Sequence, residues 1–204
     1  MKKILLSFIV VISMTILQAD AFDWMSALNF LGRTAESQAA QPQISNINDL
    51  EKQMAVIDNN VETAFIDIVS ELSGWWETRS IKSQLKSNND IFSTVISNYS
   101  NTYLETNRQS VVNKIKKMSA KDKAKLVNNL NTLAESGQSY LALAANGAKA
   151  AKNAFKAAQT VNEVATTITN VNKAAAELKN RATTVMTLAN QLKSVATAAG
   201  VSLN

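Results

Sequence analysis

Residues 164–199, VATTITNVNKAAAELKNRATTVMTLANQLKSVATAA, decide the fold of this chain. Their apolar side chains recur at alternating steps of four and three residues, which is the spacing of one helix face. A seven-residue repeat that is kept throughout such a stretch predicts left-handed, coiled-coil-like packing against another helix. The predicted helix-packing seam consists of Val164, Ile168, Val171, Ala175, Leu178, Ala182, Val185, Ala189, Leu192 and Ala196.

The two rows of this seam differ in side-chain size. The row that begins at Val164 carries Val or Leu, whereas the row that begins at Ile168 continues with alanines. Alanine removes bulk, so a neighbouring helix axis can approach to the low end of the usual separation of about 8–10 Å. We therefore expect a close, antiparallel helix pair. Thr160 and Glu163 form a capping-box pattern, but the repeat itself leaves open whether residues 141–199 form one helix or two.

The chain before this stretch is also helical in character. Asn48 and Glu51 form a capping-box pattern, and apolar residues recur at helical spacing from there to Leu72, before Gly74. A short helix is expected over 75–86, and a further apolar stripe runs from 91 to 118. Strand formers do not cluster between turn signals.

Three further signals for helix ends complete the prediction. Ser119 and Asp122 resemble a second capping box, which opens a helix that we expect Gly137 to close, and Gly200 is expected to stop the last helix. The sequence thus predicts an all-α fold, an elongated antiparallel helical bundle with coiled-coil-like, Ala-rich packing of its C-terminal helix.

The N-terminus has the order of a secretory signal peptide. A short basic region (residues 1–3) precedes an apolar run (4–17) and the small-residue site Ala19-Asp20-Ala21. We expect cleavage after Ala21 and a periplasmic or secreted bacterial protein. The predicted organisation is a signal peptide at 1–21, an N-terminal apolar helix and linker at 22–47, and a helical bundle at 48–204.

The composition narrows the possible chemistry. The chain has no Cys and no His, so thiolate nucleophiles, disulfides, zinc sites and serine–histidine triads are excluded. No legible pair of carboxylates suggests acid–base catalysis. We predict no catalytic residue, no cofactor and no metal, and hence a protein that is not an enzyme.

Charge is distributed unevenly along the chain, whose net charge is +5. The charged residues of 49–77 are mostly acidic, and those of 79–125 are mostly basic. Opposite charges on the two stretches favour helices that lie side by side. The lysines at 114, 116, 117, 121, 123 and 125 are interpreted as a solvated helix end, with binding of anionic lipid, glycan or nucleic acid as the alternative. No nucleic-acid partner is expected, because few aromatic residues accompany the lysines and the chain is expected to be exported.

Aromatic residues provide the candidate interaction sites. Adjacent residues of a helix point in different directions, so one ring of the Trp75–Trp76 pair is expected to be partly exposed, unless both pack at a bend. The apolar segment that begins the mature chain is either inserted into a partner or membrane, or buried as a cap on the bundle. The interaction candidates are Phe22, Trp24, Phe30, Trp75 and Trp76.

These observations predict an exported, non-enzymatic helical-bundle protein that acts through protein–protein interaction. It would be an assembly subunit of an envelope or secretion machine, or a surface-associated binding protein. A protein partner or self-association is expected, and contact with a membrane surface is possible. The alternative is an α-helical membrane-active or pore-forming protein. The basic, Ala-rich C-terminal helix supports this alternative.

Overall fold

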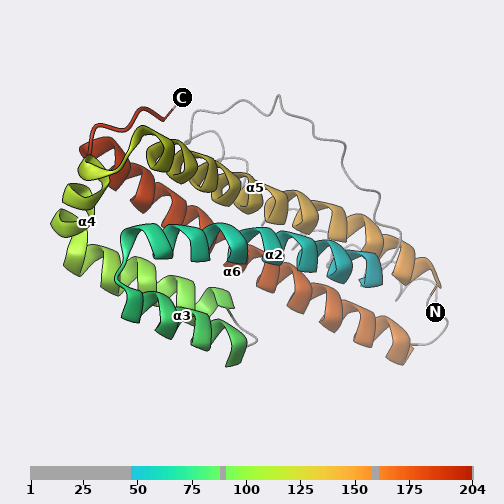
Figure 1. Cartoon of the computed structure of the whole chain (residues 1–204). Helices are drawn as coiled ribbons and strands as arrows, with labels where there is room; N and C mark the ends of the chain where they lie inside the picture. The colour runs from blue at the N-terminus through green and yellow to red at the C-terminus, as the bar shows by residue number, and fades with distance from the viewer. Residues whose placement is uncertain (1–46, 88–90, 158–160, 204) are drawn as a thin grey trace. The chain divides into compact units, whose positions relative to one another are not determined.

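The computed structural model describes residues 47–87, 91–157 and 161–203, and all regular structure in these ranges is helical (Figure 1). The all-α prediction is therefore confirmed for this part of the chain. The elements are α2 (Ile47–Leu72), α3 (Trp75–Ser87), the π-helical segments η1 (Ile91–Ile96) and η2 (Tyr99–Leu104), α4 (Glu105–Lys117), α5 (Ala120–Ala157) and α6 (Val161–Ala198). Among the described residues, none of these helices combines the length and the apolar character that a membrane span requires.

The signal peptide predicted at 1–21 lies outside the described residues, and so does the segment 22–46 with Phe22, Trp24 and Phe30. The structure does answer the question about residues 141–199. They belong to two helices, because α5 ends at Ala157 and α6 begins at Val161. The capping pattern predicted at Thr160 falls on a residue that the structure does not describe.

The described helices are divided between two compact units. The first unit contains residues 47–52, 142–157 and 161–176, and the second contains residues 53–87, 91–141 and 177–203. In the first unit Leu50 of α2 and Leu143 of α5 are buried. Gly147 of α5 faces Leu50 so closely that a Cβ atom at position 147 would lie 2.9 Å from its Cδ1 atom. A larger residue at position 147 would therefore require the end of the Leu50 side chain to move aside.

The seam of α6 forms the core of the second unit. Its members from Leu178 onward are all buried, namely Leu178, Ala182, Val185, Ala189, Leu192 and Ala196. Ala175 is half-buried in the first unit, and the side chains of Val164, Ile168 and Val171 are not described. A third row at the same seven-residue spacing, Arg181, Leu188 and Val195, is buried as well. The buried face of α6 is therefore three residues wide per heptad, as in a helix that packs against several neighbours.

Gly137 lies inside α5, so the prediction that it closes a helix is wrong. A Cβ atom at this position would lie 2.5 Å from Cγ of Met186 and 3.8 Å from the carbonyl oxygen of Ala182, both on α6. The missing side chain lets α5 and α6 approach each other across the alanine row. Close packing here outweighs the cost of about 1 kcal/mol that a glycine carries inside a helix.

The predicted start of α5 and the predicted end of α6 are observed, whereas α2 begins at Ile47, one residue before the predicted cap at Asn48. The hydroxyl of Ser119 accepts a hydrogen bond from the backbone N–H of Asp122 (3.1 Å) and donates one to its carboxylate (2.7 Å), which caps α5. After the last turn of α6, Gly200 has a φ of 80°. The N–H groups of Gly200 and Val201 bond to the carbonyls of Thr197 (2.9 Å) and Ala196 (3.0 Å). This is the Schellman arrangement, and it closes α6.

The two π-helical segments were not predicted. A π-helical turn holds more residues than an α-helical one, so side chains five positions apart can face the same side. In η2 both Tyr99 and Leu104, five positions apart, are buried, and the ring of Tyr103 stacks on that of Tyr99 with centroids 5.0 Å apart. The buried residues Val95, Ile96 and Ser100 continue this side of the segment. The wider turns thus bring an irregular apolar pattern into the core of the second unit.

Candidate interaction surface

The tryptophan pair lies where α2 ends and α3 begins, in the second unit. Ser73 and Gly74 separate the two helices, and the chain reverses its direction there (Figure 1). The inward face of α3 consists of Ile81, which is half-buried, and Leu85, which is buried, one turn apart. Trp75 and Trp76 are the first two residues of this helix.

Both tryptophan side chains are exposed, which goes further than the expectation that one ring would be. The exposed fraction is 62% for Trp75 and 73% for Trp76. Their rings meet edge to face, with centroids 4.5 Å apart and planes at 75°. The guanidinium carbon of Arg79 lies 5.3 Å from the centroid of Trp75, within cation–π range. These contacts hold the two rings in a defined arrangement at the surface.

A buried polar network fixes the corner that carries the tryptophans. The hydroxyl groups of Ser73 and Tyr99 are hydrogen-bonded to each other (3.0 Å), and Lys114 of α4 donates to the carbonyl of Ser73 (2.9 Å). Burial raises the pKa of Tyr99, against the opposing effect of the Ser73 hydrogen bond, so this phenol stays protonated. The Tyr99 ring meets Phe65 edge to face, with centroids 5.3 Å apart. The exposed pair is therefore attached to a rigid support.

A second polar centre lies deeper in the second unit and connects α2, α5 and α6. The side chain of Arg181 is only 10% exposed and forms ion pairs with Asp58 and Glu177, each at 2.6 Å. The phenol of Tyr140 donates to the other oxygen of Asp58 at 2.5 Å. Each group of this centre meets a partner from another helix or from the next turn of its own, so the arrangement satisfies buried charges.

The pKa values at this centre do not suit proton transfer near neutral pH. Burial and the hydrogen bond to Asp58 both raise the pKa of Tyr140. Burial alone would lower the pKa of Arg181, but the hydrogen bond to Glu177 and the charge of Asp58 outweigh it, so the pKa is raised. Arg181 therefore stays charged and Tyr140 stays neutral, as a structural connection between helices requires.

Acidic residues of α2 form ion pairs with basic residues of other helices. Three of them have such a partner. Asp58 pairs with Arg181, and the ammonium of Lys125 lies 3.2 Å from Asp67 and 3.5 Å from Glu71. The hydrogen bond to Asp67 raises the pKa of Lys125. Within the described residues no group of three or more acidic side chains is arranged to hold a metal ion.

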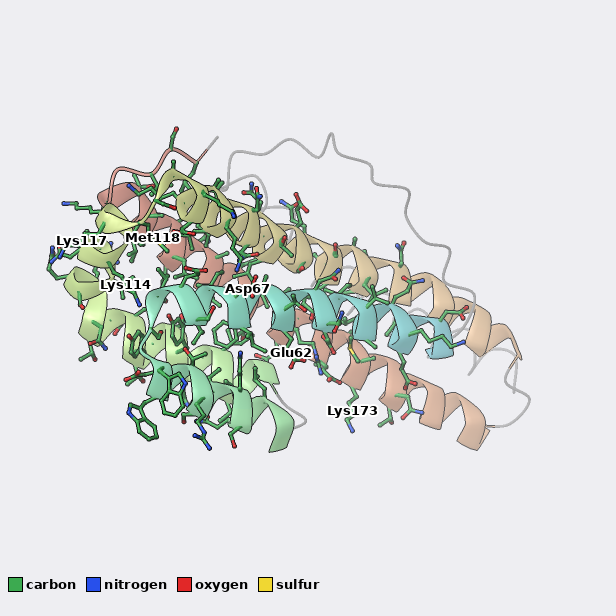
Figure 2. All side chains as sticks on the ribbon, in the orientation of Figure 1. Glu62, Asp67, Lys114, Lys117, Met118 and Lys173 are labelled. Atoms are coloured by element: carbon green, nitrogen blue, oxygen red, sulfur yellow. The ribbon has the colours of Figure 1, made fainter. Side chains whose placement is uncertain are left out.

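The other lysines of residues 114–125 lie where α4 ends and α5 begins. We call these five residues the basic corner: Lys114, Lys116, Lys117, Lys121 and Lys123. Figure 2 shows Lys114, Lys117 and Met118 at this end of the helices. The ammonium of Lys123 donates to the neutral carbonyl oxygen of Lys116 (3.2 Å). Asp122 is the one acidic residue between positions 114 and 123. The corner therefore carries a clear excess of positive charge.

Sequence reasoning found the tryptophans and the lysines but missed Arg181, Tyr140 and Arg79. A signal for Arg181 was present, because it shares the seven-residue spacing of Leu188 and Val195 and so had to face the core. A signal for Arg79 was present as well, because it lies four positions after Trp75 in the helix expected over 75–86. No comparable signal pointed to Tyr140, whose partner Asp58 is 82 positions away. No family model, curated protein or solved structure matches this chain.

Proposed function

We propose that this chain is an exported, non-enzymatic helical-bundle protein that acts by binding a protein partner, as an assembly subunit of an envelope or secretion machine or as a surface-associated binding protein. Export rests on the signal-peptide pattern of residues 1–21, and the absence of catalysis rests on a sequence without His or Cys. The partner would bind at the start of α3.

The observation that carries this proposal is the exposure of Trp75 and Trp76 together. Tryptophan is among the most enriched residues at the energetic centres of protein interfaces, because one ring buries a large area and loses little conformational entropy. Two rings already ordered by each other and by Arg79 would lose still less. An arginine beside them adds a donor that suits a polar or acidic rim around the contact.

Site-specific photo-crosslinking tests this proposal directly. A benzophenone amino acid is placed at position 76, and the full chain is irradiated in envelope extract from its source. We expect a discrete crosslinked protein, identified by mass spectrometry. The matched control places the same group at Asn128, an exposed position of α5 in the same unit. Identical products from both positions, or none from position 76, would count against a partner site on α3.

A double substitution provides the second arm. W75A/W76A should abolish the crosslink from a benzophenone at the neighbouring exposed position Ser80, while the unfolding free energy changes by less than about 0.5 kcal/mol, as is usual for surface substitutions. A crosslink that persists unchanged without the two rings would show that they are not the contact.

A further inference from the structure

The basic corner is a surface that the proposed protein contact does not use. Lys116, Lys117 and Lys121 are exposed, and none of them pairs with a carboxylate among the described residues. Lys114 and Lys123 donate to neutral carbonyl oxygens, which hold their ammonium groups in place without cancelling the charge. Lys125 differs, because Asp67 and Glu71 neutralise it. Five cationic groups thus gather at one helix–helix corner, four of them on exposed residues and Lys123 on a half-buried one.

We propose that the basic corner binds the anionic face of a phospholipid bilayer. Lysines clustered at this density bind acidic lipid surfaces through their summed charge and need no fitted pocket. Met118, which is half-buried, lies between the lysines of α4 and those of α5, so this end of the helices carries a partly exposed apolar side chain beside the charges (Figure 2). Such a combination suits the boundary between headgroups and acyl chains.

A bilayer fits this surface better than a nucleic acid does. Proteins that bind single strands combine positive charge with aromatic rings on which the bases stack. Residues 114–125 contain no aromatic residue. The export predicted for the chain would also place it beside a membrane and away from the genome. Charge without stacking groups is what a lipid surface requires.

Vesicle co-sedimentation tests the proposal with the full chain. The probes are vesicles of phosphatidylcholine with about 30% phosphatidylglycerol, and vesicles of phosphatidylcholine alone. Each lysine near an acidic surface strengthens partitioning about fivefold. The variant K116Q/K117Q/K121Q should therefore bind the acidic vesicles about 100-fold more weakly. The matched control K52Q/K82Q/K173Q removes the same charge from three exposed positions elsewhere and should bind like the unaltered chain.

Four results would overturn the proposal. These are equal binding to both vesicle types, unchanged binding of the corner variant, an equal loss in the control variant, and binding to a single-stranded oligonucleotide as tight as to acidic vesicles. Circular dichroism of each variant checks that its helices are intact. Added salt should weaken the binding, because screening acts strongly on exposed charges.

The lipid test is independent of the proposed protein partner. W75A/W76A should leave vesicle binding unchanged, while it abolishes the crosslink described above. Loss of vesicle binding in W75A/W76A but not in the corner variant would overturn the role of the basic corner. If position 76 gives no specific crosslink but vesicle binding still depends on Lys116, Lys117 and Lys121, the proposed protein partner is refuted and the proposed lipid contact stands.

Discussion

Replacing Arg181 with methionine is expected to destabilise the second unit markedly. Methionine keeps much of the length of the side chain but removes its charge and all of its donors. Asp58 would keep only the hydrogen bond from Tyr140, and its carboxylate would lose its cation within the bundle. Glu177, whose side chain is 42% exposed, would turn to water at little cost. The loss is therefore concentrated at Asp58.

The magnitude follows from the burial of the two partners. Removing one member of a buried ion pair typically costs about 3–5 kcal/mol. The Asp58 side chain is 24% exposed, so water partly compensates it, and we expect Arg181→Met to cost about 3 kcal/mol. A second substitution, Asp58→Asn, removes the uncompensated charge and keeps an acceptor for Tyr140. The double variant should therefore be about 1–2 kcal/mol more stable than the single one.

Urea unfolding followed by circular dichroism at 222 nm measures these differences, provided that the urea dependence of the free energy stays constant among the variants. The control is Lys125→Met, which breaks the exposed pairs with Asp67 and Glu71 and should cost less than about 1 kcal/mol. The reasoning would be refuted if Arg181→Met cost no more than this control, or if Asp58→Asn failed to restore stability in its background.

Two further predictions follow from the same unit. Burial raises the pKa of Tyr99 and of Tyr140 in the folded chain above the ordinary value of 10.0. As the pH rises, the unfolded chain therefore loses these two protons before the folded chain does. The free energy of unfolding should then fall above about pH 10, by up to about 2.7 kcal/mol per pH unit for the two groups. Urea titrations between pH 9 and 11.5 measure this slope, and Tyr140→Phe should roughly halve it, whereas an unchanged slope would mean that Tyr140 titrates normally. Ala182→Leu places a bulky side chain in the fully buried alanine row opposite Gly137 and should cost about 1–3 kcal/mol, while the same change at exposed Ala198 should cost less than about 0.5 kcal/mol in urea unfolding.

The sequence predicted those features that follow from local spacing. The repeat of α6 identified buried residues from Leu178 to Ala196, and hydroxyl and glycine signals identified the cap at Ser119 and the stop at Gly200. Such features depend on residues within about one or two helical turns of each other, so the amino-acid sequence alone indicates them.

Features that depend on contacts between distant segments were missed. Gly137 was interpreted as a helix stop because a glycine alone indicates flexibility, and only its contact with Met186 shows that it is a packing position. Arg181 was overlooked because a charged residue is normally expected at the surface, and its burial depends on Asp58, more than a hundred positions earlier. The exposure of both Trp75 and Trp76 depends on which other segments lie against the start of α3, and local spacing does not indicate this.

The π-helical segment Tyr99–Leu104 has a consequence for how this chain tolerates changes of length. A π-helical turn contains one residue more than the α-helical turn that it replaces. Deleting a single residue there would convert the turn to an ordinary one and leave every side chain of α4 facing its present neighbours. A deletion inside α4 or α6 would instead rotate all following positions by about 100° and turn buried side chains to water. Single-residue deletions in relatives of this chain should therefore be concentrated near Asn101 and absent from the alanine-lined helix.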